Sequence, residues 1–131
     1  MITAVDTNVL LDLFLGESPF HAESRDKLVA AYDAGAIVIC DIVYAELVLR
    51  FGDRAALDGA LRELNAVVSP VDTDIAYEAG LRWTRYRRSG GTRERILPDF
   101  LIGAHAIASA DRLLTRDRRF FASYFPDLKM A

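Results

Sequence analysis

Four acidic residues from separate segments of the chain each stand beside strongly apolar neighbours. Asp6 follows the apolar run "ITAV", Glu46 lies inside "YAELV", Asp99 follows Pro98, and Asp117 comes just after "RLLT". Carboxylates that converge repel one another, by about 4 kcal/mol for a pair about 4 Å apart near a protein surface. Because such a group persists when it takes up protons or a cation, these four acids are candidate catalytic and metal-binding residues.

The donor atoms of these acids are all oxygen, and oxygen donors favour the hard cations Mg²⁺ and Mn²⁺ over zinc. Magnesium usually keeps several water ligands, and phosphate oxygens can replace them. Such an ion activates water and offsets charge on a phosphate, and a second ion can hold the leaving oxygen. The acids therefore indicate metal-assisted hydrolysis of a phosphodiester, with Mg²⁺ as the expected cofactor and Mn²⁺ as a substitute.

Each acid taken singly also has a structural interpretation. Asp6 is a suitable helix cap, and Asp117 is suited to cap the turn "TRDRRF", because Asp is favoured at cap positions. Asp99 suits the positive end of a helix dipole, and Glu46 suits an exposed position on a helix. The combination of all four, in this order and at these places, favours a functional site.

Strand-like and helical segments alternate along the chain, and they predict where the acids lie. This alternation is typical of an α/β fold with a parallel sheet covered on both faces. Ligands of such sheets bind outside the carboxyl ends of the strands, where Asp6 and Asp117 are expected. Strands are predicted at 2–5, 36–40, 67–71 and 111–115, with an edge strand at 125–130, and helices at 9–15, 23–34, 42–51, 54–66, 72–88 and 98–110.

The composition is that of one folded domain spanning 1–131. Hydrophobic residues make up 52% of the 131 residues, the formal net charge is -3, and the single cysteine, Cys40, ends an apolar run. No apolar run approaches the ~20 residues that a membrane helix needs, and the first residues do not resemble a signal peptide. The cytoplasm is therefore the expected compartment, with no membrane partner.

Arginines are concentrated in one stretch of this acidic protein, "RWTRYRRSGGTRER". A local basic patch can bind a polyanion even when the net charge is negative. The stretch is therefore either an RNA-docking surface or a solvated helix end with its loop. Its arginines are Arg82, Arg85, Arg87, Arg88, Arg93 and Arg95.

Three segments resemble the signature blocks of the PIN-domain ribonucleases, and in particular the VapC-type toxins of bacterial toxin–antitoxin pairs. They are "AVDTNVLLDLF", "YAELV" and "PDFLIGAHAIASADRLLTRDRRFF", and the resemblance covers nearly the whole chain. It implies a PIN-like three-layer α/β/α domain whose central, mostly parallel sheet has four to five strands. It also implies that Asp6, Glu46, Asp99 and Asp117 form the acidic metal-binding quartet of that family.

The resemblance implies supporting residues and partners as well. Thr7 and Asn8 match the turn after the first acid, where Asn8 would hold the acidic groups by hydrogen bonds, and Thr115 matches the hydroxyl residue two positions before the last acid. Members of the family are Mg²⁺- or Mn²⁺-dependent endoribonucleases; many cleave tRNA or ribosomal RNA, form homodimers and are inhibited by a cognate antitoxin. Arg116 and Arg118, which flank Asp117, would contact phosphate or antitoxin, with surface solvation as the alternative.

Two other functions remain open beside the metal-dependent endoribonuclease that this sequence favours. One is a Mg²⁺-dependent aspartyl phosphotransferase or phosphatase with Asp6 as the nucleophile. Such enzymes often carry a second Asp two positions later, where this chain has Asn8. The other is a non-catalytic PIN-like interaction module, against which the intact quartet argues. Whether one metal ion or two would bind is also open.

Overall fold

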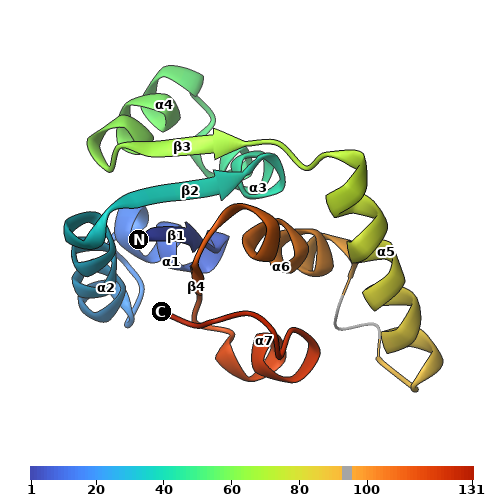
Figure 1. The fold of residues 1–131 in the computed structure, drawn as a ribbon. Helices are drawn as coiled ribbons and strands as arrows, with labels where there is room; N and C mark the ends of the chain where they lie inside the picture. Colours follow the sequence, from blue (N-terminus) through green and yellow to red (C-terminus); the bar gives the residue numbers. More distant parts are fainter. Residues whose placement is uncertain (93–95) are drawn as a thin grey trace.

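A four-stranded parallel sheet forms the centre of the protein (Figure 1). The computed structural model describes residues 1–92 and 96–131. Every neighbouring pair of strands is parallel, in the order β3-β2-β1-β4, which confirms the predicted α/β class. The strands are β1 (Ile2–Val5), β2 (Ala36–Cys40), β3 (Ala66–Ser69) and β4 (Arg112–Leu114).

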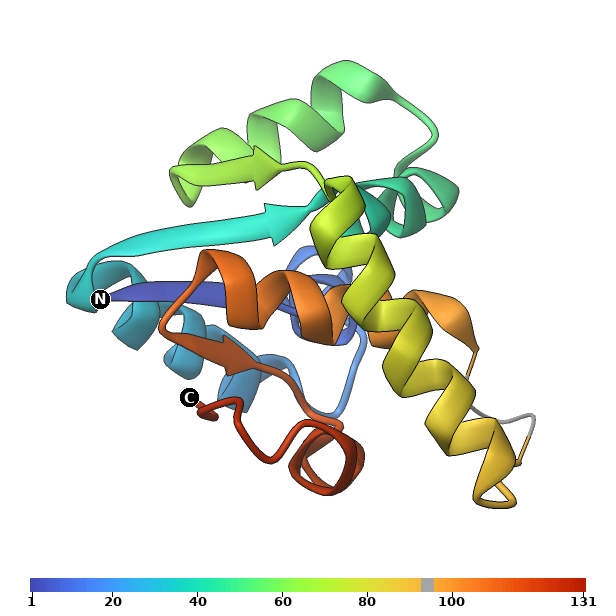
Figure 2. The same ribbon diagram turned by 45° about the vertical axis from the view of Figure 1, so that its right-hand side comes forward.

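Helices cover both faces of the sheet, so the domain has three layers. Helix α6 lies on one face with α5 packed along it, and α1 and α2 lie behind the sheet (Figures 1 and 2). This arrangement agrees with the expected PIN-like α/β/α architecture. The helices are α1 (Thr7–Leu15), α2 (His21–Ala34), α3 (Asp41–Phe51), α4 (Arg54–Glu63), α5 (Thr73–Arg88), α6 (Leu97–Ser109) and α7 (Arg118–Tyr124).

The two central strands are continuous apolar runs because both of their faces are covered. In β2, Ile37 and Ile39 are each 1% exposed, and they alternate with buried residues that face the other layer. Strand β3 lies at the edge and leaves Val67 and Val68 exposed. The register pairs Val5 with Leu114, so β1 and β4 end side by side. The first residues after these strands therefore share one edge of the sheet.

Local signals set the ends of several helices. The Asp72 carboxylate accepts a 2.8 Å hydrogen bond from the Ile75 amide and begins α5, whose last turn is basic, as the macrodipole favours. Helix α1 ends at Gly16, whose φ of +69° is a left-handed conformation that glycine adopts without strain. The predicted helix at 54–66 ends earlier, at Glu63, because β3 begins at Ala66.

The C-terminal part of the chain differs from the prediction. The segment 125–130 does not form the expected edge strand: it makes only an isolated bridge between Met130 and Leu113. Before it, α7 occupies a stretch that was expected to be a turn after Asp117. The reason is a demand for apolar burial, since Phe120, Phe121 and Phe125 pack with Phe100 of α6 into an aromatic cluster.

Within residues 1–92 and 96–131, no helix combines the length and the apolar character needed to cross a membrane.

Candidate active site

Asp6 stands at the end of β1 and begins α1. Its amide donates a 2.9 Å hydrogen bond to the Leu114 carbonyl, so the backbone is still bonded to β4 at this point. The residue is 8% exposed; its carboxylate Oδ1 accepts from the Thr7 amide at 2.8 Å, and Oδ2 accepts from Thr115 Oγ1 at 2.7 Å. One oxygen therefore caps the helix, as the structural interpretation expected, while the other accepts from the residue that follows β4.

The electrostatic environment of Asp6 is unfavourable to its negative charge. Burial raises the pKa of Asp6 to about 6, hydrogen bonds from Thr115 and Thr7 oppose that rise, and the carboxylates of Glu46 and Asp99 add to it. The influence of Glu46 and Asp99 places three of the predicted acids within electrostatic reach of one another. A cation at this position would remove the repulsion that these carboxylates exert on Asp6.

Glu46 and Asp99 reach this edge of the sheet from two different helices. Glu46 lies on α3, and its Oε1 accepts a 2.7 Å hydrogen bond from Thr7 Oγ1. Thr7 thus bonds to Asp6 through its amide and to Glu46 through its hydroxyl. Asp99 lies in the first turn of α6, where its Oδ2 accepts from the Ile96 amide at 3.2 Å. Asp99 therefore stabilises the start of a helix, as its alternative interpretation expected, and it remains half-buried.

Asp117 is joined to the site through its backbone. It precedes α7, and no side-chain hydrogen bond from it caps that helix. Its amide donates to Thr115 Oγ1 at 3.0 Å, while the same hydroxyl donates to Asp6. The Asn8 side chain accepts a 3.3 Å hydrogen bond from the Arg116 amide. Asn8 therefore holds the backbone directly before Asp117.

The donor set of the site fits a hard cation that keeps most of its water. In the part of the chain that the structure describes, no three carboxylate, imidazole or thiol side chains are placed so that they enclose a metal ion. Magnesium does not need such a cage, because it is commonly held by one or two carboxylates, with water and substrate oxygens as its other ligands. The buried Asp6, with Glu46 and Asp99 raising its pKa, meets that requirement.

Asp12, a buried acid that was not predicted as a site residue, binds Arg116, which directly precedes Asp117. Asp12 of α1 is 2% exposed, and its Oδ2 accepts hydrogen bonds of 2.6 Å from both Ser24 Oγ and Arg116 Nε. Arg116 also stacks on the Phe20 ring, with its guanidinium carbon 4.3 Å from the ring centroid. The signal was present, since Asp12 interrupts an apolar helix in the same way as Glu46 does.

The predicted RNA-binding arginines fall into distinct classes. Arg82 is paired with Glu78 and Asp127, which leaves 15% of its side chain exposed, and Arg116 is paired with Asp12. Arg118 donates to the carbonyl of Ala131. These three have protein partners. Arg85, Arg87 and Arg88 are exposed on the last turns of α5, where the guanidinium carbon of Arg87 lies 5.1 Å from the centroid of the Trp83 ring. Arg93 and Arg95 lie outside the described residues.

Comparisons with known proteins agree with this architecture. The family model of the PIN domain matches residues 3–125. No curated protein sequence matches the chain. Among solved structures, VapBC2 from Rickettsia felis, bound to a DNA fragment from its promoter, has a TM-score of 0.76 and 21% identity, covering 100% of this chain and 98% of that chain.

Two further solved structures are similar over most of their length. A toxin–antitoxin complex from Klebsiella pneumoniae has a TM-score of 0.70 and 24% identity, covering 96% of this chain and 94% of that one. The sarcin–ricin loop cleaving toxin VapC20 of Mycobacterium tuberculosis has a TM-score of 0.67 and 22% identity, covering 92% of this chain and 94% of that one. At these identities the likeness establishes a shared fold.

Proposed function

This chain belongs to the PIN-domain family, and on that premise we propose that it is a divalent-metal-dependent endoribonuclease, the toxin of a toxin–antitoxin pair. The observation that carries the proposal is the environment of Asp6. A buried carboxylate at the carboxyl end of a parallel sheet stands within reach of two further carboxylates, which raise its pKa. That arrangement costs free energy unless a cation binds, and the edge of the sheet is where substrates of such folds bind.

The proposed cofactor is Mg²⁺, with Mn²⁺ as a substitute, held by Asp6, Asp99 and Asp117 and with Glu46 at or near a second position. When bound, the ion supplies a lowered pKa for water and neutralisation of charge on the scissile phosphate. Oxygen-only donors select these hard ions. This assignment follows the donor chemistry of the four acids and the family to which the chain belongs.

The chain's own residues orient the acids for this chemistry. Thr115 holds one oxygen of Asp6 and the amide of Asp117, so a single hydroxyl sets the relative position of two acids. Thr7 does the same for Asp6 and Glu46. Both threonines are buried, so their rotamers are fixed by packing. Preorganised carboxylates do not have to be rearranged when a polyanionic substrate arrives, which lowers the barrier of the reaction.

The toxin assignment rests on what the similar solved structures are. One of the similar structures is a toxin–antitoxin complex, and another is a toxin that cleaves the sarcin–ricin loop. We propose by analogy that this chain cleaves tRNA or ribosomal RNA in the cytoplasm, acts as a homodimer, and is inhibited by a cognate antitoxin protein.

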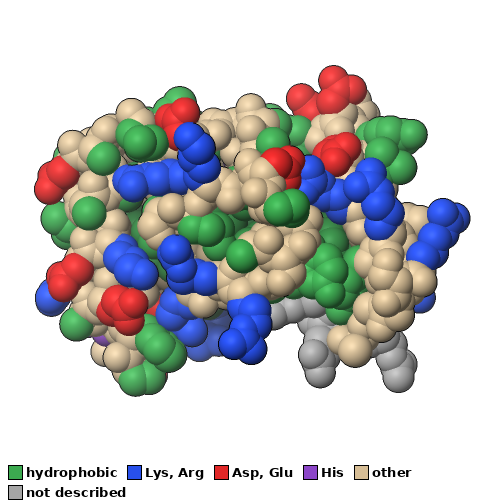
Figure 3. Space-filling view, turned by 60° about the horizontal axis from the view of Figure 1, so that its bottom comes forward, with side chains coloured by type: hydrophobic (Ala, Val, Ile, Leu, Met, Phe, Trp, Pro, Cys, Tyr) green, Lys and Arg blue, Asp and Glu red, His purple; other side chains and the backbone are tan. Residues whose placement is uncertain are grey.

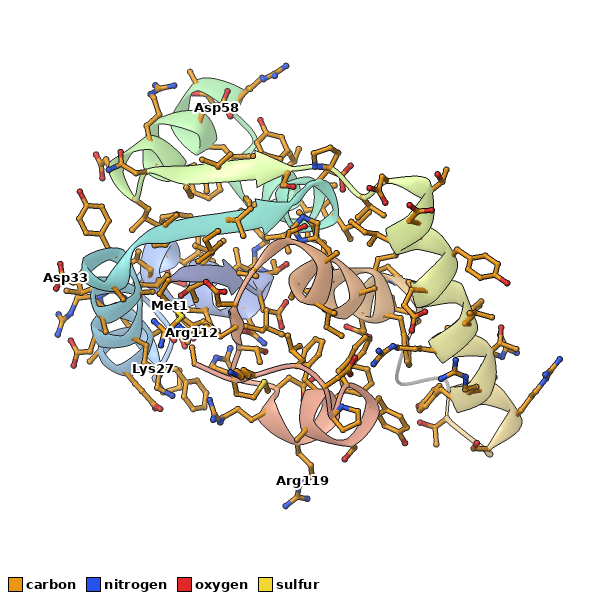
Figure 4. The ribbon with its side chains drawn as sticks, in the orientation of Figure 1. Met1, Lys27, Asp33, Asp58, Arg112 and Arg119 are labelled. Carbon is orange, nitrogen blue, oxygen red and sulfur yellow. The ribbon has the colours of Figure 1, made fainter. Side chains whose placement is uncertain are left out.

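The test is cleavage of purified tRNA and ribosomal RNA by the full chain with Mg²⁺, with Mn²⁺, or with EDTA. We expect cleavage with either ion, none with EDTA, and a loss of at least a hundredfold in Asp6→Asn and Asp99→Asn. Asp33→Asn is the matched control, because Asp33 is an exposed acid at the end of α2, away from the carboxyl ends of the strands (Figure 4). Each variant is checked for an unchanged circular dichroism spectrum.

Three outcomes would contradict this function. Cleavage in EDTA would exclude the metal mechanism, and full activity in Asp6→Asn would exclude the site. Transfer of phosphate onto Asp6 from a small phosphate donor would instead support the aspartyl phosphotransferase.

A further inference from the structure

A trough runs between α5 and α7 and begins beside Asp117. It consists of two adjoining hollows of about 410 and 390 Å³, each within the size range of small-molecule sites. The two hollows adjoin, because both are lined by Tyr86, Ser89, Ser123 and Tyr124. In Figure 3, hydrophobic side chains follow the hollow between the body of the protein and α5, with Lys and Arg side chains on either side. We call this feature the α5–α7 trough.

The wall of the trough on the α5 side is built by a close backbone approach. The Gly91 amide donates to the Tyr86 carbonyl at 2.9 Å, and the Tyr86 hydroxyl donates to the Thr92 carbonyl at 2.9 Å. A Cβ atom on Gly91 would lie 2.5 Å from the Tyr86 ring, so only glycine allows this contact. Tyr86 itself is 5% exposed. This wall is therefore fixed by packing and hydrogen bonds.

On the α7 side of the trough, an exposed aromatic ring is supported by buried rings. Tyr124 is 41% exposed, and its ring lies edge-to-face with Tyr86, with the centroids 5.0 Å apart. The centroid of the Phe120 ring lies 5.3 Å from that of Tyr124. Because both supporting rings are buried, Tyr124 loses little rotamer freedom when a ligand stacks on it. A planar group that enters the trough meets a preformed stacking surface.

Cationic side chains stand at both ends of the trough. Arg119 lines the hollow that contains Asp117, and Arg85 lines the other hollow. Neither arginine forms an ion pair with a carboxylate in residues 1–92 or 96–131. Figure 4 shows Arg119 extending from α7 into solvent, where a phosphate can approach it. Asp127, the acid at the Arg85 end, forms an ion pair with Arg82. The hydrogen bond from Arg82 holds the pKa of Asp127 below its usual value.

We propose that the α5–α7 trough binds a nucleotide of single-stranded RNA beside the scissile phosphate, with its base stacked on Tyr124 and its flanking phosphates bound by Arg85 and Arg119. This inference rests on the proposed function, because that function places the scissile phosphate near Asp117. The strand must be single, since bases in a duplex are already stacked and cannot enter the trough. Ser89 and Ser123 supply hydroxyls that can bind base edges and bias the choice of base.

The chemistry favours a nucleotide over a peptide. The exposed Tyr124 ring lies between Arg85 and Arg119, in a trough that begins beside the acidic site. This order matches that of a nucleotide, whose planar base lies between two flanking phosphates. An antitoxin segment that occupied the trough would be the competing result.

The experiment measures fluorescence anisotropy of a labelled, mixed-sequence, eight-nucleotide single-stranded RNA titrated with the full chain in EDTA, where the proposed cleavage cannot occur. We expect Tyr124→Leu to weaken binding about tenfold, and Tyr124→Phe to bind as wild type because it keeps the ring. Arg85→Gln and Arg119→Gln should each weaken binding and make the slope of log affinity against log salt shallower by about 0.7, the contribution of one phosphate contact on a single strand.

Two control variants match these changes outside the trough. Tyr77→Leu makes the same change at an exposed tyrosine of α5, which is 69% exposed. Arg54→Gln removes an arginine of α4. Both should bind RNA as wild type does. In cleavage assays with Mg²⁺, Tyr124→Leu should raise KM more than it lowers kcat and should change the base preferred beside the cut.

The outcomes separate this inference from the proposed function. Wild-type RNA affinity in Tyr124→Leu, or equal losses in Tyr124→Leu and Tyr124→Phe, would overturn the stacking site. If Tyr124→Leu bound RNA as wild type does but bound the antitoxin more weakly, the trough would be a binding site for the antitoxin, and the proposal would be overturned. RNA binding that depends on Tyr124, without any metal-dependent cleavage, would retain the trough and overturn the endoribonuclease.

Discussion

The hydroxyl of Thr115 donates a 2.7 Å hydrogen bond to Oδ2 of Asp6 across 109 positions of the sequence. The two residues meet because β1 and β4 are neighbours whose last residues, Val5 and Leu114, are in register. The bond therefore forms only when the sheet forms. It couples the position of the buried Asp6 carboxylate to the strand that leads to Asp117.

Replacing Thr115 by valine removes this bond while keeping the volume of the side chain. The pKa of Asp6 should rise further, because the Thr115 hydrogen bond opposes the effect of burial. The Asp117 amide also loses its acceptor, at a cost of about 1–3 kcal/mol of unfolding free energy. We expect weaker Mg²⁺ binding by calorimetry, and an acid limb of the activity profile that moves to higher pH.

The control for Thr115→Val is Thr84→Val. Thr84 is exposed on α5 and donates to the Gly80 carbonyl at 2.8 Å, so the same chemical change is made away from the acids. An unchanged pH profile in Thr115→Val would show that this hydroxyl does not position Asp6.

The raised pKa of Asp6, about 6, predicts how the stability of the metal-free protein depends on pH. Between the unfolded value near 3.9 and about 6, the native state binds more protons than the unfolded state, so stability falls as pH rises through this window. The loss is on the order of 3 kcal/mol and is complete above the folded pKa. We expect Asp6→Asn to lack this component, measured as the difference between the two proteins in chemical denaturation from pH 4 to 7.

Added Mg²⁺ should act in the opposite direction. Above pH 6, Asp6 is ionised and the ion should raise the melting temperature by mass action, whereas at pH 5 the effect should be small. Asp6→Asn should show little Mg²⁺ effect at either pH. Equal pH dependence in wild type and Asp6→Asn would mean that Asp6 is not the titrating group.

The fold could be predicted from the sequence because its signals are local. Continuous apolar runs such as 36–40 indicate strands buried on both faces, and caps such as Asp72 mark where helices begin. The α7 helix and the loss of the edge strand at 125–130 could not be predicted, because they follow from the packing of Phe120 and Phe125 against Phe100, which is distant in sequence.

The site, too, could be predicted only in part from the sequence. The four acids stand out because each interrupts an apolar context, but their hydrogen bonds run between segments that the sequence does not place side by side. Asn8 was expected to hold the acidic groups in place by hydrogen bonds, and its side chain accepts a hydrogen bond from the Arg116 amide, next to Asp117. Arg116 was a candidate for phosphate contact, yet it forms an ion pair with Asp12, because a charge at that buried position requires a partner.

The Asp12–Arg116 pair predicts a pH effect of opposite sign to that of Asp6. Burial alone would raise the pKa of Asp12, but hydrogen bonds from Ser24 and Arg116 outweigh it and hold the pKa below its usual value. Asp12 therefore contributes stability above its unfolded pKa that is lost as pH falls. Asp12→Asn should cost about 1–3 kcal/mol of unfolding free energy at pH 7, because the buried carboxylate loses charge-assisted hydrogen bonds from Ser24 and Arg116.

A double-mutant cycle with Arg116→Met measures the coupling of this pair, which should exceed about 1 kcal/mol. The matched control is Asp26→Asn, which breaks the exposed Arg25–Asp26 pair and should change stability by less than about 0.5 kcal/mol. Equal costs for the two substitutions would contradict a structural role for Asp12.

Two glycines in helices predict opposite effects of the same substitution. A Cβ atom on Gly103 of α6 would lie 2.5 Å from Cζ of Phe125, a fully buried ring, whereas a Cβ atom on Gly80 of α5 would meet nothing within 4 Å. Gly103→Ala should therefore destabilise by about 1–3 kcal/mol through overpacking. Gly80→Ala should stabilise by about 0.5–1 kcal/mol, since alanine loses less backbone entropy than glycine in a helix.

The measurement is the midpoint of urea unfolding for each variant. The double variant Gly103→Ala with Phe125→Leu tests the cause, because a smaller side chain at 125 relieves the contact with the new methyl group. If overpacking is the cause, Gly103→Ala should cost less in the Phe125→Leu background than in wild type. An equal cost in both backgrounds would mean that the Phe125 ring is not what excludes a side chain at position 103.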